Sequence, residues 1–351
     1  MIKVLVVEDS AVVRAFLVHI LRSDPGIEVV GVASDGLEAV DAVRRMRPDV
    51  VTMDIHMPKL DGIEATRRIM ETHPTPIVIV SGSSDPEEVT TTFAAVEAGA
   101  LAVMRRPSGL GHPDHEESAG ELLRIVKLMA EVKVVRRWAR RSIENAAGSS
   151  MAAPGRVSAI RSVGIGASTG GPPVLQAILS ALPGDFPLPI LIVQHMTVGF
   201  TEGFVDWLNH SSRLRVHLAA NGETLVPGHV YVAPDGFQMG IEEGERIVLT
   251  PGTARNGLCP SVSHLFRSMA NLHGGDVVAG LLTGMGRDGA EELRLLKDLG
   301  AQTFVQDRES SVVHGMPGEA IRLGAASLVL PADRIAATLV TLSRRGKRED
   351  T

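Results

Sequence analysis

A serine in the second half of the chain has the sequence context of an activated nucleophile. Ser168 lies in the segment Val163–Pro173, with the sequence VGIGASTGGPP, which contains the pattern G-x-S-x-G. We expect a buried strand to run into this segment and a helix to begin near Pro172, because proline fits the first helical turn. Such a strand–turn–helix exposes the serine hydroxyl on a sharp turn. The helix N-terminus would also offer N–H groups to a developing oxyanion.

A serine hydroxyl needs a base to take its proton, and the base needs a carboxylate to fix its tautomer. The next predicted strand, Leu188–Gln194, ends at His195, and a third strand leads into Leu282–Gly289, which contains Asp288. Parallel neighbouring strands end at one edge of a sheet, so His195 should lie beside Ser168. The sequence therefore predicts a Ser-His-Asp triad. Its chain order differs from the Ser, Asp, His order of α/β-hydrolases.

Each of these residues also has a simpler interpretation. The glycines around Ser168 could form a dinucleotide-binding loop, but that site needs an acid after the second strand, where His195 stands. A lone histidine is often structural, and Asp288 could cap a helix that begins at Ala290. No His-Asn context surrounds Cys259, so we interpret it as a buried or loop thiol.

Three carboxylates in the first half form a second candidate site. Glu8 and Asp9 follow the first predicted strand and Asp54 follows the third, so all three should meet at one sheet edge. Such a cluster is tolerable when it holds a hard divalent cation such as Mg²⁺. Ser81, after the fourth strand, could bond a transferred phosphoryl group, and Arg106 supplies a cation after the fifth. The simpler interpretation is three loop acids that face water.

The elements that would position these side chains alternate between short apolar runs and helical periodicity. In the first half we expect strands at 2–7, 28–33, 50–53, 77–81 and 101–104, and helices at 11–22, 36–46, 61–72, 87–98 and 122–139. In the second half we expect strands at 160–165 and 188–194 and helices at 172–181 and 201–209. The segments 262–270, 277–282, 290–299 and 302–306 continue the alternation, after a small antiparallel excursion of 230–233 and 246–249 with a turn at 243–244.

Residues 1 to about 125 resemble a response-regulator receiver domain through Val6–Ser10 (VVEDS) and Met53–Pro58 (MDIHMP). The resemblance implies roles for these residues: Asp54 as phosphoacceptor, Glu8, Asp9, Asp54 and the His56 carbonyl as Mg²⁺ ligands, and Ser81 as switch hydroxyl. Receivers carry lysine where Arg106 stands. Arginine keeps the charge but presents a planar fork, so this departure bears on phosphoryl capture and switching.

Residues 160 to about 343 resemble the catalytic domain of chemotaxis protein-glutamate methylesterases. The matching stretches are 166–171, 194–196 with 200–201, 230–234, 282–290, 306–307, 311–313 and 315–317. The resemblance implies the following roles: Ser168 as nucleophile, His195 as general base, Asp288 as its partner, Met285 as an oxyanion contributor and Thr169 in the same cleft. Thr197, Cys259 and Ser263 stand where the family usually has Pro, Arg and Asp, and these departures could retune substrate docking.

The predicted fold is therefore α/β with two doubly wound parallel-sheet domains. We expect a flavodoxin-like receiver at 1–125, a helix and linker at 126–158, and a Rossmann-like serine hydrolase domain with a small antiparallel excursion at 159–345. Within 126–158, the linker itself is Glu144–Val157. Before it comes an arginine-rich helical stretch, which we interpret as a solvated helix face, with a docking surface for an acidic partner as the alternative. Its arginines are Arg136, Arg137, Arg140 and Arg141.

Composition limits the function classes. The chain has 351 residues, of which 44% are hydrophobic and 22% charged, a net charge of −6 and one cysteine. These values argue against a disordered protein, a disulfide scaffold and a nucleic-acid binder that relies on phosphate contacts. No signal peptide or membrane-spanning run is expected, so we expect a cytoplasmic protein without direct membrane insertion.

The two resemblances together imply a phosphorylation-regulated enzyme that hydrolyses glutamate γ-methyl esters, and deamidates glutamines, on methyl-accepting chemoreceptors. A histidine kinase would be the phosphodonor, the receiver would need Mg²⁺, and the esterase site would need no cofactor. Two alternatives stay open: a non-catalytic scaffold controlled by the receiver, and a constitutive esterase whose receiver has lost its switch. A DNA-binding output domain is disfavoured, because the second half has catalytic patterning instead of basic patterning.

Overall fold

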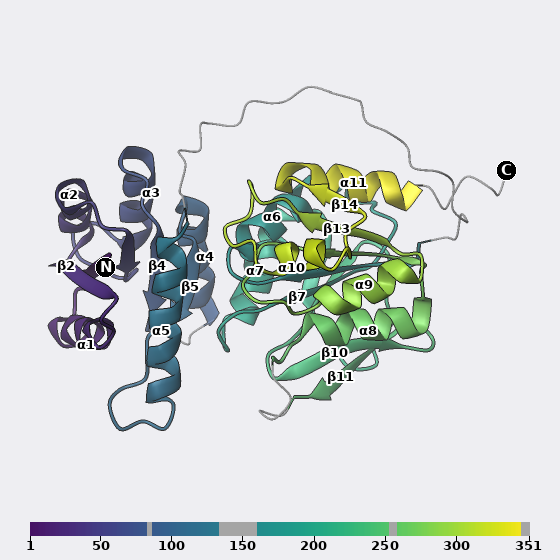
Figure 1. Cartoon of the computed structure of the whole chain (residues 1–351), viewed down its shortest axis with the longest axis horizontal. Coiled ribbons are helices and arrows are strands. Elements are labelled where there is room, and N and C mark those ends of the chain that lie inside the picture. Colours follow the sequence, from purple (N-terminus) through teal and green to yellow (C-terminus); the bar gives the residue numbers. More distant parts are fainter. Residues whose placement is uncertain (83–85, 133–159, 253–257, 345–351) are drawn as a thin grey trace.

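Two parallel sheets organise the chain in the computed structural model, which describes residues 1–82, 86–132, 160–252 and 258–344. The first half forms a five-stranded sheet of order β2-β1-β3-β4-β5, and the second half forms a seven-stranded sheet of order β14-β13-β12-β6-β7-β9-β8. A two-stranded ribbon, β10-β11, accompanies the larger sheet (Figure 1). Helices cover these sheets, so the predicted fold class is confirmed.

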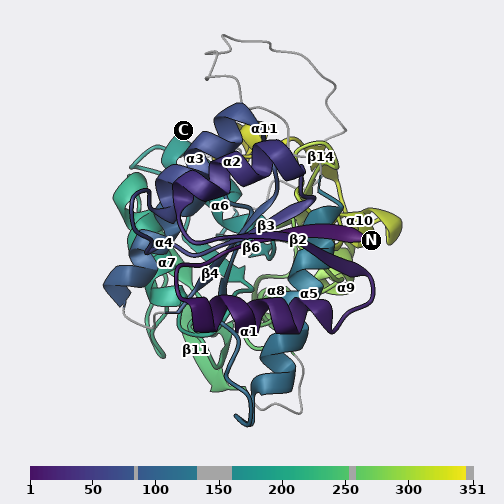
Figure 2. The ribbon, with the colours of Figure 1, turned by 90° about the vertical axis from the view of Figure 1, so that its left-hand side faces the viewer.

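Helices α1 and α5 cover one face of the smaller sheet, and α2, α3 and α4 cover the other (Figure 2). The last helix begins seven residues before its predicted start at 122, and the tail of that prediction, 133–139, lies outside the described residues. The elements of the first half are β1 Ile2–Val7, α1 Ala11–Arg22, β2 Ile27–Ala33, α2 Gly36–Met46, β3 Val50–Met53, α3 Gly62–Thr72, β4 Ile77–Ser81, α4 Pro86–Ala98, β5 Ala102–Arg105 and α5 His115–Ala130.

The inner strands of the larger sheet, β6, β7, β12 and β13, are largely buried on both faces, which explains their mainly apolar sequences. Helices α6, α7 and α11 cover one face, and α8, α9 and α10 cover the other. The elements of the second half are β6 Ser162–Ala167, α6 Gly171–Ala181, β7 Ile190–Gln194, α7 Thr201–Ser211, β8 Arg215–Leu218, β9 His229–Val232, β10 Phe237–Glu242, β11 Arg246–Pro251, α8 Val262–His273, β12 Val277–Leu281, α9 Ala290–Asp298, β13 Gln302–Gln306, α10 Met316–Arg322, β14 Leu328–Leu330 and α11 Ala332–Arg344.

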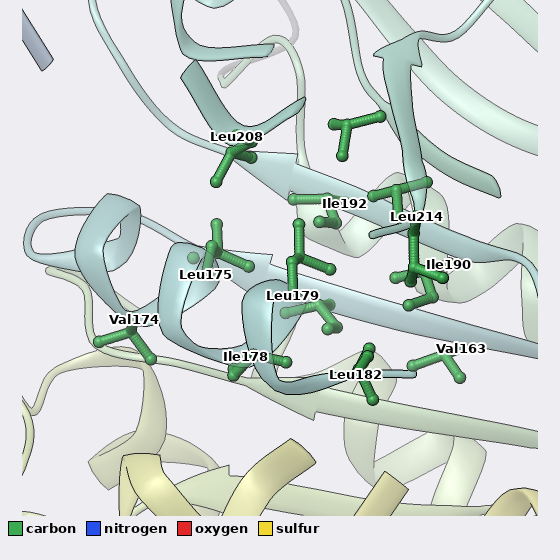
Figure 3. Packing of buried hydrophobic residues seen from close by; sticks show 14 of the residues in the cluster. Val163, Val174, Leu175, Ile178, Leu179, Leu182, Ile190, Ile192, Leu208 and Leu214 are labelled. Atoms are coloured by element: carbon green, nitrogen blue, oxygen red, sulfur yellow. The ribbon is translucent and has the colours of Figure 1, made fainter. Parts of the chain in front are cut away.

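Helix α6 fixes the orientation of the central strands through an aliphatic face. Figure 3 shows Leu175 and Leu179 of this helix over Ile190 and Ile192 of β7, with Val163 of β6 beside them. All five side chains are fully buried. Burying an aliphatic side chain of this size stabilises the fold by about 1.5–3 kcal/mol, so this contact holds β6 and β7 firmly in register.

The predicted antiparallel pairing of 230–233 with 246–249 is wrong. Strand β9 lies parallel to β7 inside the large sheet, and the antiparallel partner of β11 is β10. The residues of β9 are buried on three of four positions, which suits a strand inside a two-faced sheet. The predicted turn at Glu243 and Gly244 does connect the two strands of the ribbon. Strands β8, β10 and β14 and helices α10 and α11 were not predicted.

The two halves of the chain meet through helices α4 and α7, whose aromatic side chains form one continuous core. Phe93 stacks on Trp207 with ring centroids 5.3 Å apart, and it lies 5.5 Å from Phe204. Beside the rings, Glu97 accepts hydrogen bonds from the Trp207 indole at 2.8 Å and from the Gln176 amide at 2.7 Å. We call these five residues the α4–α7 seam.

The predicted linker and the arginine-rich stretch before it, 136–141, fall within 133–159 and so lie outside the described residues. Across the described ranges, no helix is both long enough and apolar enough to cross a lipid bilayer.

Candidate functional site

The loops that carry the predicted triad follow three neighbouring parallel strands, which end at the same edge of the large sheet. Ala167 at the end of β6 is paired with Gln194 at the end of β7, and Gly166 is paired with Leu281 at the end of β12. Ser168 and His195 therefore follow their strands side by side. Strand order reverses at β6, where the crossovers turn to opposite sides of the sheet. Such a switch point is where ligands bind in open α/β sheets.

The predicted pair of His195 and Asp288 is present. The imidazole Nε2 lies 2.9 Å from the Asp288 carboxylate, and both side chains are largely buried. The carboxylate also accepts hydrogen bonds from the Ser261 hydroxyl at 3.0 Å and from the Val262 and Ser263 amides at 2.6 and 3.1 Å. Asp288 thus binds the N-terminus of α8, and not the helix at Ala290 that the simpler interpretation suggests.

These contacts determine the protonation state of Asp288. Burial alone would raise its pKa, but the hydrogen bonds from His195 and Ser263 and the Val262 amide outweigh burial and hold the pKa far below its ordinary value. The carboxylate is therefore ionised at neutral pH. Because Nε2 of His195 is engaged with it, Nδ1 is the ring nitrogen left to act as a base toward Ser168.

Ser168 and His195 line one cavity of about 220 Å³, together with Thr169. Within the described residues, no hydrogen bond joins the Ser168 hydroxyl to the imidazole. Catalytic hydrogen bonds are often long before substrate binds, so the proton path between the two side chains stays a prediction. Met285 does not line this cavity. Its side chain is 41% exposed, and its sulfur accepts a hydrogen bond from Arg124 of α5 at 3.1 Å.

The first turn of α6 offers fewer donors than we expected for an oxyanion. Pro172 and Pro173 carry no N–H, and the Gly171 amide already donates to the Ser168 carbonyl at 2.8 Å. The expectation of several free N–H groups at this helix terminus is therefore wrong. The Thr169 amide, which follows the nucleophile in the tight turn, is the best remaining donor.

The glycines around the nucleophile serve close packing. A Cβ at Gly164 would lie 2.6 Å from the Met269 sulfur of α8, and one at Gly166 would lie 2.5 Å from Val262 of the same helix. These positions must be glycine for α8 to approach β6, and α8 in turn brings its N-terminus to Asp288. This packing accounts for them without a dinucleotide.

The first half of the chain supplies part of the cavity wall. Phe93 and Val96 of α4, Val103 of β5 and Glu121 and Arg124 of α5 line the same cavity as Ser168 and His195. Glu121 is also within 3.5 Å of the Thr197 hydroxyl. Strand β5 and helices α4 and α5 therefore stand over the catalytic edge of the larger sheet (Figure 1).

The three acids of the smaller sheet come together as predicted. Val7 and Met53 are paired at the ends of β1 and β3, and ligand atoms of Glu8, Asp9 and Asp54 lie within 4.8 Å of one another. This all-oxygen donor set fits a hard cation such as Mg²⁺.

The charge balance in this pocket depends on burial and on one cation. Burial and the nearby Asp54 raise the pKa of Glu8 to about 7, and burial also raises the pKa of Asp54. Arg106 opposes both shifts, and its Nη2 lies 3.4 Å from Glu8. The Nε of Arg106 is buried without a hydrogen-bond partner, so this guanidinium retains an unused donor. Ser81 is buried at the end of β4.

The CheB methylesterase family model matches residues 163–339, and the response regulator receiver domain model matches residues 4–111. A protein-glutamate methylesterase/protein-glutamine glutaminase of Nitrosospira multiformis is 64% identical over 99% of both chains. This chain belongs to the CheB methylesterase family.

Other CheB proteins show the same correspondence. A protein-glutamate methylesterase/protein-glutamine glutaminase of Geobacter metallireducens is 59% identical over 98% of this chain and 99% of its own length. The crystal structure of the Thermotoga maritima CheB methylesterase catalytic domain is 38% identical, with a TM-score of 0.50, and covers 52% of this chain and 98% of its own.

The three departures from the usual CheB sequence all lie near the site. Thr197 contacts Glu121 across the domain boundary. The Ser263 hydroxyl accepts a hydrogen bond from the Gly289 amide at 2.9 Å, and so helps to hold the loop that carries Asp288. Cys259 is half-buried, and burial raises the pKa of its thiol.

Sequence reasoning missed the residues that hold the triad. Ser261 binds Asp288, and Gln194 binds the main chain of Ser168 and of His195. Their only sequence signal is position. Ser261 stands just before a predicted helical segment, as an N-cap would, and Gln194 is a polar residue that ends a fully apolar strand.

Replacing Asp288 tests the triad assignment. We expect Asp288→Asn to lower kcat about 10²- to 10⁴-fold with little change in KM, because an amide can stabilise neither the productive tautomer nor the imidazolium. The assay is methanol release from methylated receptor membranes. The control is Asp298→Asn, at an exposed aspartate on α9 that forms an ion pair with Arg294. Equal rates for Asp288→Asn and the control would remove Asp288 from the mechanism.

Magnesium binding should depend on pH through Glu8. A raised pKa of about 7 means that a proton competes with the cation below this pH, so Mg²⁺ affinity should rise about tenfold from pH 6 to pH 8 and then level off. Isothermal titration calorimetry measures this directly. Glu8→Gln should bind weakly at every pH, whereas Glu28→Gln, on the exposed side of β2, should behave like the wild type. A flat profile for the wild type contradicts the prediction.

Proposed function

We propose that this CheB protein hydrolyses glutamate γ-methyl esters on chemoreceptors with Ser168 as nucleophile, His195 as base and Asp288 as its partner. The observation that carries the proposal is the bond between His195 Nε2 and the ionised Asp288, in the same cavity wall as Ser168. Asp288 keeps the ring proton on Nε2, so Nδ1 is unprotonated and can accept the proton of Ser168. A histidine with a purely structural role would not need a buried, ionised carboxylate on its ring.

In the first step, His195 Nδ1 takes the Ser168 proton while the serine oxygen attacks the γ-carbonyl carbon. The carbonyl oxygen becomes an oxyanion, which the Thr169 amide is placed to stabilise. The oxyanion then collapses, the bond to the methoxy group breaks, and His195 returns its proton to release methanol. Asp288 stabilises the imidazolium throughout and stays ionised, in keeping with its low pKa.

In the second step, water replaces the serine. His195 takes a proton from water, the hydroxide attacks the acyl carbon, and the Ser168 oxygen leaves with the proton from the imidazolium. The product is a free glutamate side chain. A glutamine side chain follows the same course with ammonia in place of methanol, which accounts for deamidation by one site.

The receiver covers this site in the structure described above. The α4–α7 seam holds one side of the interface, and Arg124 and Glu121 of α5 contact Met285 and Thr197 on the other. Receiver side chains of α4, β5 and α5 form part of the wall of the cavity that Ser168 and His195 line, where a receptor helix about 10–12 Å wide would have to present its ester. The closed form therefore excludes the macromolecular substrate while its triad stays assembled.

Phosphorylation of Asp54 by a histidine kinase would shift the interface toward an open state. When bound, Mg²⁺ supplies charge neutralisation for phosphoryl transfer, and Glu8, Asp9, Asp54 and the His56 carbonyl would hold it. The unpartnered Nε of Arg106 is a donor that the new phosphoryl group would satisfy. Ser81, at the end of β4, would act as the switch hydroxyl.

One experiment tests both halves of the proposal. Methanol release from methylated receptor membranes is measured for wild type, Ser168→Ala and Asp54→Asn, with and without acetyl phosphate and Mg²⁺. Ser168→Ala should abolish hydrolysis in all conditions, because no other group supplies the nucleophile. Asp54→Asn should keep the basal rate and lose the stimulation by phosphodonor.

The outcomes separate the alternatives. If Ser168→Ala hydrolyses esters as the wild type does, the chain is no serine esterase. A wild-type rate that ignores the phosphodonor supports a constitutive enzyme whose receiver does not switch. A small soluble ester such as p-nitrophenyl acetate does not need room for a receptor helix, so its hydrolysis should depend little on phosphodonor.

Loosening the α4–α7 seam should mimic phosphorylation. Glu97→Ala removes the acceptor for both Trp207 and Gln176. Glu97 is exposed at the edge of the seam, so the two bonds together contribute about 0.5–1.5 kcal/mol. We expect the receptor demethylation rate without phosphodonor to rise about tenfold. Glu71→Ala, an exposed residue of α3, is the matched control and should leave the rate unchanged. A basal rate as low as that of the wild type would show that Glu97 does not hold the closed form.

A further inference from the structure

Gln194 is a buried polar residue at the centre of the site that has no part in the reaction described above. It ends β7, directly before His195, and lines the cavity of the triad. Only 5% of it is exposed. A polar side chain this deeply buried has to be held by hydrogen bonds, so its contacts indicate its purpose.

Its side-chain amide bridges the two catalytic loops. The Nε2 group donates to the Ser168 carbonyl at 2.9 Å and to the His195 carbonyl at 2.7 Å. Both acceptors are oxygens, so the opposite orientation of the amide would place Oε1 against two carbonyls. The contacts therefore fix the orientation of Gln194, and with it the distance between the nucleophile turn and the loop of the base.

The bond to Ser168 has a consequence for the oxyanion donor. The Ser168 carbonyl is held twice, by Gln194 and by the Gly171 amide at 2.8 Å. A peptide bond is planar and trans, so its N–H points opposite to its C=O. Fixing the direction of this carbonyl therefore also fixes the direction of the Thr169 N–H, in the turn that lines the cavity.

The bond to His195 acts in the same way on the base. The His195 amide donates to the Ala167 carbonyl at 2.9 Å, and its own carbonyl accepts from Gln194. The main chain of the base is thus tied on both sides to the strand and turn that carry the nucleophile.

The other end of the amide shows that this arrangement has a cost. Oε1 is buried without a hydrogen-bond partner, and it sits so close to Gly171 that a Cβ there would lie 2.1 Å from it. An unpaired buried acceptor is destabilising. An apolar side chain of the same length would avoid this cost, so the two bonds made by Nε2 are what the glutamine contributes.

We propose that Gln194 is a positioning residue, which sets the direction of the Thr169 amide and the placement of His195 through its two carbonyl contacts. This inference rests on the proposed roles of Ser168 and His195. One side chain would then fix how the turn of Ser168 and the loop of His195 lie relative to each other.

The test uses the full-length protein with acetyl phosphate and Mg²⁺, and methanol release from methylated receptor membranes. Gln194→Met keeps the length and removes the donor. We expect kcat to fall about 10- to 100-fold with KM within about twofold, since misplaced donors and bases act on the transition state.

Gln194→Glu gives a readout that a merely structural role would not move. An ionised glutamate has no donor and repels both carbonyls, whereas a protonated one restores one O–H donor. The rate of this variant relative to wild type should therefore rise at least about fivefold from pH 8 to pH 5.5. Gln302→Glu, exposed at the opposite end of β13, should give a flat ratio near one.

The outcomes decide between three cases. If Ser168→Ala remains active, the proposed triad fails, whatever Gln194 does. Loss of activity in Ser168→Ala with unchanged kcat in Gln194→Met, or a flat pH ratio in Gln194→Glu, overturns the positioning role alone. If Gln194→Met does not fold, the pH dependence of the rate ratio for Gln194→Glu decides the positioning role by itself.

Discussion

The Asp288 carboxylate accepts hydrogen bonds from the His195 ring, from the Ser261 hydroxyl and from two main-chain amides at the start of α8. This one group therefore links the base to the helix that packs on β6. Partial positive charge at a helix N-terminus and a cluster of donors both favour the ionised form. Without the carboxylate, α8 would lose its N-terminal acceptor and His195 would lose its tautomer. The fold of this edge and the ability of His195 to accept a proton therefore depend on the same group.

The receiver is attached to this edge by two chemically different contacts. The three aromatic rings of the α4–α7 seam are buried, and Glu97 accepts two hydrogen bonds at their exposed edge, whereas the α5 side consists of single polar contacts to Thr197 and Met285. Apolar packing is non-directional and scales with buried area, and exposed polar contacts contribute little. The α5 side is therefore the weaker one. A modest structural change around Asp54 would therefore break the α5 contacts more easily than the α4–α7 seam.

Much of this could be predicted from the sequence, because strong periodicity and short motifs determine it. The alternation of apolar runs and amphipathic helices gave the strands of the receiver and the central strands β6, β7, β12 and β13 within two residues. The meeting of His195 with Asp288 followed from parallel strands ending at one edge. The pairing of β9 could not be predicted, since a short apolar strand fits a ribbon or a sheet equally well, and only the tertiary fold decides between them.

The parts of the site that sequence could not predict are contacts between main chain and side chain. Nothing in the letters around Gln194 states that its amide reaches two carbonyls, and Ser261 is an ordinary N-cap until Asp288 arrives from a distant loop. The expectation of several free N–H groups at the start of α6 was wrong for a local reason. Pro172 and Pro173 have no N–H, and the Gly171 amide is already bonded to the Ser168 carbonyl. Expectations for the phosphoacceptor, the switch hydroxyl and the oxyanion residue Met285 stay predictions.

The seam between α4 and α7 has a further consequence for how copies of the protein meet. Phe93, Phe204 and Trp207 pack as the interior of a single domain does, and nothing in that packing depends on both helices belonging to one polypeptide. A receiver displaced from its own esterase can therefore seat on that of a neighbour. Exchange of identical elements is a low-cost route to dimers. At a high local concentration, each receiver would then cover the esterase domain of a neighbouring copy.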